Sequence, residues 1–381
     1  MLFTKHQKIK LMNIKSHVCL VLIINMITTM VIAQEPAVPI KPRHYVCYKT
    51  HEPLNIDGRP DESDWAKAEW TDYFVDIEGS MKPSPRLKTR AKMLWDDNYL
   101  YIGAFLEEPH VWGTLTERES VIFYDPDFEI FIDPDGDTHN YMEYEMNALN
   151  TQWDLLLTKP YRDDLVRNVA IDHWNYNGMK SGVYIDGTIN NPCDTDSGWY
   201  VEVALPLDAI AEVNTGGKKP GAGDQIRIDF SRVEWTVDII NGRYVKRTHL
   251  VDGKEKPLPE DNWVWSPQGV IAMHQPETWG FLQFSGKIVG SGIDDFIEDP
   301  DYAVMQALRK LYFRQNSFFE KTGKYSNSPK ELGINEIPEL NKPDKLVLRL
   351  TSSAYEATLP GTNAGTLWHI TQDGRVWKTR Q

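Results

Sequence analysis

Alternating polar residues inside short apolar stretches are the feature of this sequence that could do chemistry. A strand over residues 140–148 would place Tyr141, Glu143, Glu145 and Asn147 on one face and apolar or aromatic side chains on the other. Carboxylates and amides beside aromatic rings suit a sugar, because hydroxyls need polar partners and the C–H face of a pyranose needs an apolar plane. The alternative is the wetted face of an ordinary antiparallel sheet, where such acids only meet water.

Two further stretches repeat this pattern. A strand over residues 127–133 would put Glu129 on a face opposite to its isoleucines, and the stretch 225–235 alternates in the same way around Ser231. Arg232 follows where the apolar phase slips, as a β-bulge would cause. Polar residues on several strands favour a cleft that binds a ligand over a sheet face that only contacts water.

The elements that must position these residues are short strands. Apolar or alternating stretches bounded by Asp, Gly, Pro and Asn predict strands near residues 45–50, 88–95, 98–106, 127–133, 140–148, 152–157, 182–186, 198–205, 225–235 and 279–284. No stretch before residue 290 keeps a helical period long enough for the crossovers of a parallel sheet. The sequence therefore predicts an all-β fold, an antiparallel jelly-roll-like β-sandwich over residues 34–290.

The pattern changes after residue 290. Residues 291–381 predict a small α+β appendage with an amphipathic helix at about 301–321 and strands at 346–350 and 366–370. The order of helix, Gly323-Lys324-Tyr325 and small hairpin looks like the globular part of pilin-type proteins. Such a segment could dock to the sandwich or to a protein partner.

Residues 1–33 are typical of a signal peptide. Four lysines precede an apolar run from Val18 to Ala33, and we expect cleavage after Ala33 and a secreted or periplasmic protein. The alternative is a membrane anchor, but the run contains polar residues and falls short of the ~20 apolar residues of a spanning helix. Cleavage removes four lysines and no acid, changing the formal charge from −14 to −18. Nucleic acid and anionic membranes are therefore not expected partners.

Two cysteines remain after the predicted cleavage, Cys47 and Cys193. In an oxidising compartment a disulfide between them is expected, and two unpaired thiols are the alternative.

A possible metal site follows the strand at 127–133. Asp133, Asp135 and Asp137 alternate around Gly136, which suits a hard, oxygen-seeking cation such as structural Ca²⁺. The stretch lacks the downstream Glu of an EF-hand, and a polar turn is the alternative.

Six short segments follow one another in a fixed order: Asn55–Gly58, Asp61–Trp65, Leu94–Tyr101, Asp127–Asp133, Gly198–Glu202 and Trp279–Leu282. This ordered set resembles carbohydrate-binding module family 9 and its DOMON-like relatives. The resemblance covers about residues 45–285 and implies an antiparallel sandwich that binds sugars, often at a glycan end, with bound calcium and no catalysis.

The resemblance also implies which residues would bind the ligand. The acceptor on the strand at 127–133 falls on Glu129, the polar pair on the next strand on Glu145 and Asn147, and a further polar residue on Ser231 or Arg232.

The best-known members of the family clamp the sugar between two tryptophans, and this sequence departs from that pattern. The two tryptophan positions hold Phe123 and His274, and Glu145 stands where a basic residue is expected. Trp235 is one tryptophan that could supply a replacement plane, together with Trp112 and Trp265.

Other classes of function stay open. Glu129 and Glu145 could be the acid pair of a glycoside hydrolase or lyase, and Met146 and His274 could bind haem in a relative of the same sandwich. A surface or periplasmic adaptor that makes contact through its C-terminal segment is a further alternative. The sequence shows no nucleophile triad, phosphate-binding glycine loop or Cys/His zinc cluster.

Overall fold

The fold is given by a computed structural model that describes residues 35–36, 40–163, 169–340 and 345–380. The predicted signal peptide lies outside the described residues. Within them, no helix is both long and apolar enough to pass through a bilayer.

Strands dominate the first 290 residues, as predicted. The strands of the main sheet are β1 (His44–Lys49), β2 (Val75–Asp76), β3 (Thr89–Trp95), β4 (Tyr99–Glu107), β5 (Asp127–Asp133), β6 (Tyr141–Asn147), β7 (Gln152–Leu157), β8 (Ala170–Ile171), β9 (Lys180–Asp186), β10 (Gly198–Pro206), β11 (Gln225–Glu234), β16 (Asp261–Val264) and β17 (Gly280–Ile288). Two short helices accompany them, α1 (Ser63–Lys67) and α2 (Leu207–Val213).

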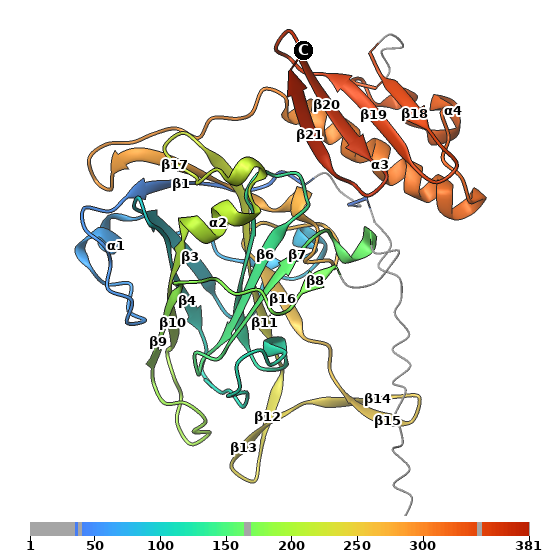
Figure 1. Ribbon diagram of the computed structural model, residues 1–381. Helices are drawn as coiled ribbons and strands as arrows, with labels where there is room; N and C mark the ends of the chain where they lie inside the picture. Colours follow the sequence, from blue (N-terminus) through green and yellow to red (C-terminus); the bar gives the residue numbers. More distant parts are fainter. Residues whose placement is uncertain (1–34, 37–39, 164–168, 341–344, 381) are drawn as a thin grey trace, which may run out of the picture. The chain divides into compact units, whose positions relative to one another are not determined.

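These strands form a two-layered sandwich. The sheet has 13 strands, along the path β8-β7-β6-β5-β11-β17-β1-β3-β4-β10-β9, with β16 and β2 attached beside β11. Phe128, Met142 and Phe230 from one half share one buried core with Ile102 and Val203 from the other half. The sheet therefore folds over on itself, and the all-β sandwich predicted from the sequence is confirmed (Figure 1).

The pairing is antiparallel except at β1. This strand runs parallel to both of its neighbours, β17 and β3, whereas the remaining pairs of the sheet are antiparallel. Alternation along β1 gives no sign of direction, because the side-chain period of two is the same in both kinds of pair.

Two hairpins that the sequence analysis missed extend from the sandwich between β11 and β16 (Figure 1). They are β12 (Val237–Ile240) with β13 (Arg243–Lys246), and β14 (Thr248–Val251) with β15 (Lys254–Pro257). Their turns are Asn241-Gly242 and Asp252-Gly253, all four with positive φ. Asn-Gly and Asp-Gly are the dipeptides favoured in two-residue hairpin turns, so the signal was present in the sequence.

The C-terminal segment has a separate hydrophobic core. It contains α3 (Tyr302–Thr322), α4 (Pro329–Leu332) and the antiparallel strands β18 (Val347–Leu350), β19 (Tyr355–Pro360), β20 (Thr366–Thr371) and β21 (Val376–Arg380). Leu308 and Leu311 of α3 pack against Ala357 and Ile370 of the sheet. Asp301, just before α3, accepts a hydrogen bond from the Trp368 indole at 2.8 Å, which fixes the start of the helix to β20.

The predicted disulfide is wrong. Cys47 is fully buried on β1 in the core of the sandwich, whereas Cys193 is exposed in the loop between β9 and β10, and both are free thiols. An inward-pointing strand residue and an exposed loop residue do not bring their sulfur atoms together. Two unpaired thiols were the alternative, and the structure favours it.

Candidate functional site

Four carboxylates and a serine lie on the outer face of β5, β6 and β11. Alternation sends Phe128 and Ile130 of β5 into the core, so that Asp127 and Glu129 point to the opposite face. Glu145 of β6 lies directly opposite Glu129 in the strand register. Hereafter, Asp127, Glu129, Glu143, Glu145 and Ser231 are called the acid face.

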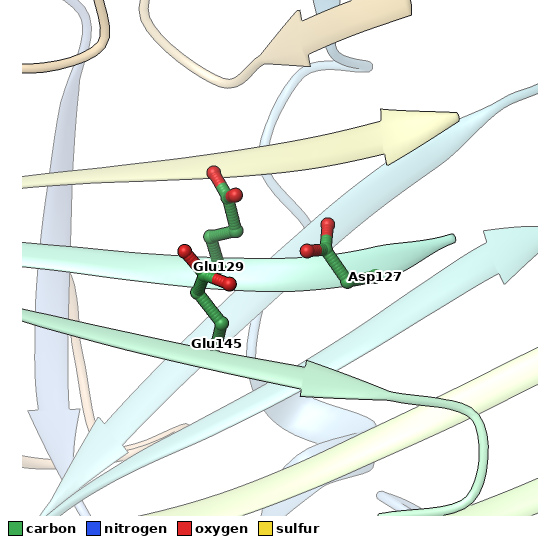
Figure 2. Close-up of side chains that lie close together, drawn as sticks. All are labelled: Asp127, Glu129 and Glu145. Carbon is green, nitrogen blue, oxygen red and sulfur yellow. The ribbon is translucent and has the colours of Figure 1, made fainter. Parts of the chain in front are cut away.

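The register of β11 adds the serine. Ser231 lies directly opposite Glu129 on the other side of β5, so that Ser231, Glu129 and Glu145 form one row across three strands. Carboxylate oxygens of Asp127, Glu129 and Glu145 lie within 4.8 Å of one another. Figure 2 shows their carboxylates gathered over β5 and β6.

The acid face is buried. Asp127 is 0%, Glu129 5% and Glu145 2% exposed, and none of them forms an ion pair with a lysine or arginine of the described residues. Burial raises the pKa of Glu129 to about 7. Burial and the repulsion of Glu129 also raise the pKa of Asp127 and of Glu145 well above the ordinary range. Negative charge is therefore costly here until a ligand or a cation compensates for it.

Aromatic rings border the acid face beside Glu143. Burial raises the pKa of Glu143 to about 8, and its Oε2 lies 4.0 Å from Nε2 of His274. The ring of His274 stands edge-on to Phe131 and Tyr161, with centroids 5.8 and 4.6 Å away. Tyr161 is 43% exposed, so this border offers a ring to solvent.

Two hollows of the described residues lie away from the acid face. One of about 370 Å³ lies beside Gln275, Thr278 and Arg309, and another of about 500 Å³ lies in the C-terminal segment beside Phe318 and Leu350. Neither of these two hollows includes an acid-face residue. The side chains of the acid face are almost fully buried, and an open cleft there stays a prediction.

Asn147 belongs to a turn, contrary to the ligand-binding role predicted for it. Its Nδ2 donates to the carbonyl of Leu115 at 2.9 Å and to Asp125 at 3.0 Å, and its Oδ1 accepts from the amides of Leu149 and Thr151 at 3.0 Å. The side chain is fully buried. Asn147 thus holds the β6–β7 connection and keeps no polar atom for a ligand.

Arg232 also departs from its predicted role. It continues the alternation of β11 without a shift in register, so the predicted bulge is absent. Its side chain points to the side of the sheet away from Ser231, is 0% exposed, and pairs with Glu108 at 2.8 Å and Glu234 at 2.6 Å. Arg232 is a buried structural cation whose guanidinium is paired with Glu108 and Glu234.

The predicted aromatic positions fall in two separate clusters. Phe123 and Trp235 pack together with Trp112, and the Trp235 indole donates to the Phe123 carbonyl at 2.9 Å. His274 instead contacts Phe131 and Tyr141. Phe123 and His274 therefore do not form a facing pair of rings. Met146 lies in the sandwich core, on the side of β6 opposite to the acid face, so Met146 and His274 do not converge on one iron.

The aspartates of the predicted calcium loop are close together, yet their oxygens are occupied. Asp133, Asp135 and Asp137 have carboxylate oxygens within 4.8 Å of one another. Each of the six oxygens accepts a hydrogen bond from the chain, including those from Thr138 to Asp133 and from Arg375 to Asp137. The donor set suits calcium in type, but the loop is closed by its own partners, and calcium there stays a prediction.

Sequence reasoning placed Asp127 and Glu143 on the polar faces of their strands but did not assign them to the ligand. Asp127 precedes Glu129 by two residues, and Glu143 precedes Glu145 by two, so strand alternation alone assigns all four to one face. Tyr161 had no such signal, because it lies in the 3₁₀ turn Tyr161–Asp163 outside the sheet.

Comparison with known proteins identifies the central part of the sandwich. Residues 56–238 match the family described as carbohydrate family 9 binding domain-like, and this range includes all of β5, β6 and β11. No curated protein matches the chain significantly.

Two solved proteins among those that match the chain share little sequence identity with it. A carbohydrate binding module family 9 from Caldicellulosiruptor kristjanssonii, solved with cellotriose and with glucose, is 17% identical and has a TM-score of 0.40, covering 66% of this chain and 100% of its own. A provisionally assigned carbohydrate-binding protein from Bacteroides uniformis is 14% identical, with a TM-score of 0.46 and coverages of 64% and 100%.

Proposed function

Because residues 56–238 belong to the carbohydrate family 9 binding domain-like family, we propose that this chain is an exported, non-catalytic protein that binds a mono- or oligosaccharide at the acid face. The observation that carries the proposal is the row of Ser231, Glu129 and Glu145 across three strands. Hydroxyl groups of a sugar would donate to these oxygens. The exposed ring of Tyr161 would meet a C–H face of the sugar.

The electrostatics of the site support binding over hydrolysis. A glycosidase needs one carboxyl held protonated and a second one kept ionised. Here burial raises the pKa of both Glu129 and Glu145, so neither carboxyl is held firmly in the ionised form that the second role requires. The non-catalytic role stays part of the proposal, together with export by residues 1–33.

Calorimetry and a glycan array in calcium-containing buffer test the proposal. We expect the full chain to bind at least one mono- or oligosaccharide and Glu129→Gln to weaken that binding about tenfold, because a neutral amide offers one acceptor in place of two. Glu255→Gln on the exposed hairpin strand β15 is the matched control and should bind like the wild type. Absence of binding by the wild type to every sugar would remove the proposal.

Release of reducing sugar from the bound oligosaccharide is the accompanying assay. We expect none above background. Turnover that disappears in Glu145→Gln would replace the binding proposal with a hydrolase.

A further inference from the structure

The acid face has polar atoms that the protein itself does not satisfy. Asp127 Oδ2, Glu145 Oε2 and Ser231 Oγ are buried and have no hydrogen-bond partner within the described residues. The other oxygen of Asp127 accepts from the amide of Val233 at 3.0 Å, which fixes this carboxylate in place. A buried polar atom without a partner has lost the hydrogen bonds that it would make to water, so these three positions favour a group that is not part of the chain.

A positively charged group would suit these atoms. Three carboxylates with oxygens within 4.8 Å repel one another when ionised, and burial makes that repulsion stronger than in water. Lys246 is the nearby cation, but its ammonium lies over the Trp235 ring, 3.3 Å from the centroid, and makes no ion pair with the acid face among the described residues. Lys246 interacts with Asp127 only through space, so none of the three carboxylates has a cation in direct contact among the described residues.

The spacing fits a single ion of calcium size. Ca²⁺ binds carboxylate and hydroxyl oxygens at about 2.3–2.6 Å, so two oxygens on one ion lie at most about 5 Å apart. The 4.8 Å limit for the oxygens of Asp127, Glu129 and Glu145 falls within this span. The aspartate loop at 133–137 has similar spacing, but all six of its carboxylate oxygens accept hydrogen bonds from the chain. The acid face differs from that loop because its Asp127 Oδ2 and Glu145 Oε2 atoms have no hydrogen-bond partner within the described residues.

We propose that the acid face binds a hard divalent cation through Asp127, Glu129 and Glu145, with Ser231 beside it, and that the cation takes part in recognising the sugar. Calcium takes six to eight oxygen ligands, so a handful of protein oxygens leaves positions that two sugar hydroxyls could fill. The metal site stands on its own observations, whereas its part in sugar recognition rests on the function proposed above.

Terbium luminescence tests the metal site directly. Tb³⁺ replaces calcium at oxygen sites and emits when a nearby indole is excited. Trp153 lies opposite Glu145 in the β6–β7 register, so its indole is placed to sensitise the ion. In the EDTA-treated and desalted full chain, we expect saturable emission that added Ca²⁺ displaces, and Ca²⁺ binding by calorimetry.

Two charge-matched variants locate the ion. Glu145→Gln should weaken Ca²⁺ binding at least about tenfold, while Asp135→Asn in the aspartate loop should leave it unchanged. Near-wild-type thermal melting without metal shows that each variant still folds. Unchanged Ca²⁺ affinity and stoichiometry in a folded Glu145→Gln, or no Ca²⁺ binding by the wild type, would overturn the site.

Sugar binding with calcium and with EDTA then tests the coupling. We expect EDTA to weaken binding of the array-identified sugar about tenfold or more, and Ca²⁺ to restore it. Equal affinity in both buffers would overturn the participation of the cation while the carbohydrate proposal stands. Calcium binding without any sugar binding would have the opposite meaning: the metal site would stand and the carbohydrate proposal would fall.

Discussion

His274 is held neutral by its surroundings. Burial first, and then the positive charge of Arg162, lower the pKa of His274 to about 3. Tyr141 contacts Nδ1 of the ring at 3.0 Å, Tyr161 packs edge-on against it, and Glu143 lies 4.0 Å from Nε2. The ring therefore serves as a packed, uncharged side chain at the border of the acid face.

Because His274 is neutral in the folded protein, we expect the free energy of unfolding to decrease at acid pH. In the unfolded chain a histidine titrates near pH 6.5, so its contribution is present above that pH and is lost as the pH falls toward about 3. We expect His274→Gln to remove about 1–3 kcal/mol of the decrease in unfolding free energy between pH 6.5 and 4. Urea unfolding across this range measures it. Exposed His173→Gln is the control, and equal decreases in both variants would contradict the assignment.

At the residue scale, strand alternation identified the polar face of each strand but not how the strands group these residues. Glu129, Glu145 and Ser231 could be assigned to one face from the sequence, because the period of two is fixed by the strand itself. Their grouping depends on which strands are neighbours and in what register, and a single sequence does not contain that information. Asn147 shows the limit clearly: it follows the same alternation, yet the turn after β6 uses all of its polar atoms.

At the element scale, one anchored loop accounts for several of the family-like segments. Glu202 of β10 accepts hydrogen bonds from the amides of Asp57 and Gly58 at 3.0 and 2.9 Å and from the indole of Trp65 at 2.8 Å. Gly58 has φ +94°, and a Cβ there would lie 2.5 Å from the Val183 backbone. These residues hold the loop on the outside of β9 and β10, so their role is structural.

Gly58→Ala should therefore destabilise the sandwich by about 2–4 kcal/mol, because it combines an unfavourable φ with a clash against the β9 backbone. Gly242→Ala is the matched control, since Gly242 also has positive φ (+72°) but has nothing within 4 Å of its added Cβ. It should cost only about 1 kcal/mol. Chemical unfolding of both variants measures the difference, and equal losses would show that the close approach is unimportant.

The strands themselves were largely predictable. The expected strand at 127–133 has the observed bounds, and that expected at 140–148 is observed at Tyr141–Asn147, because buried strands impose a clear apolar period. The projecting hairpins lack that period, since most of their side chains are exposed on both faces. Only their Asn-Gly and Asp-Gly turns could have revealed them from the sequence.

At the scale of the whole molecule, the described residues contain two large hydrophobic cores, one in the sandwich and one in the C-terminal segment. The aspartate loop connects them. Arg375 pairs with Asp137 at 2.8 Å, the amide of Val376 donates to the Asp137 carbonyl at 3.1 Å, and Thr138 donates to the carbonyl of Gly374 at 3.2 Å. The family match ends at residue 238 and does not reach the C-terminal segment, so its pilin-like character and any protein partner stay predictions.

These contacts predict that the aspartate loop is chiefly a joint between the two cores. Arg375→Ala should leave the buried Asp137 carboxylate without its cation and weaken the joint by about 1–2 kcal/mol, because the arginine is itself half-exposed. Calorimetric unfolding should then separate into two transitions, or show an earlier onset, and limited proteolysis should cut faster between residues 290 and 300. Arg380→Ala, at the exposed end of β21, is the control and should unfold like the wild type. If calcium instead stabilises this loop, EDTA should destabilise the wild type in the same way as Arg375→Ala does. That result would support a calcium site at the aspartate loop and contradict its role as a joint held by Arg375.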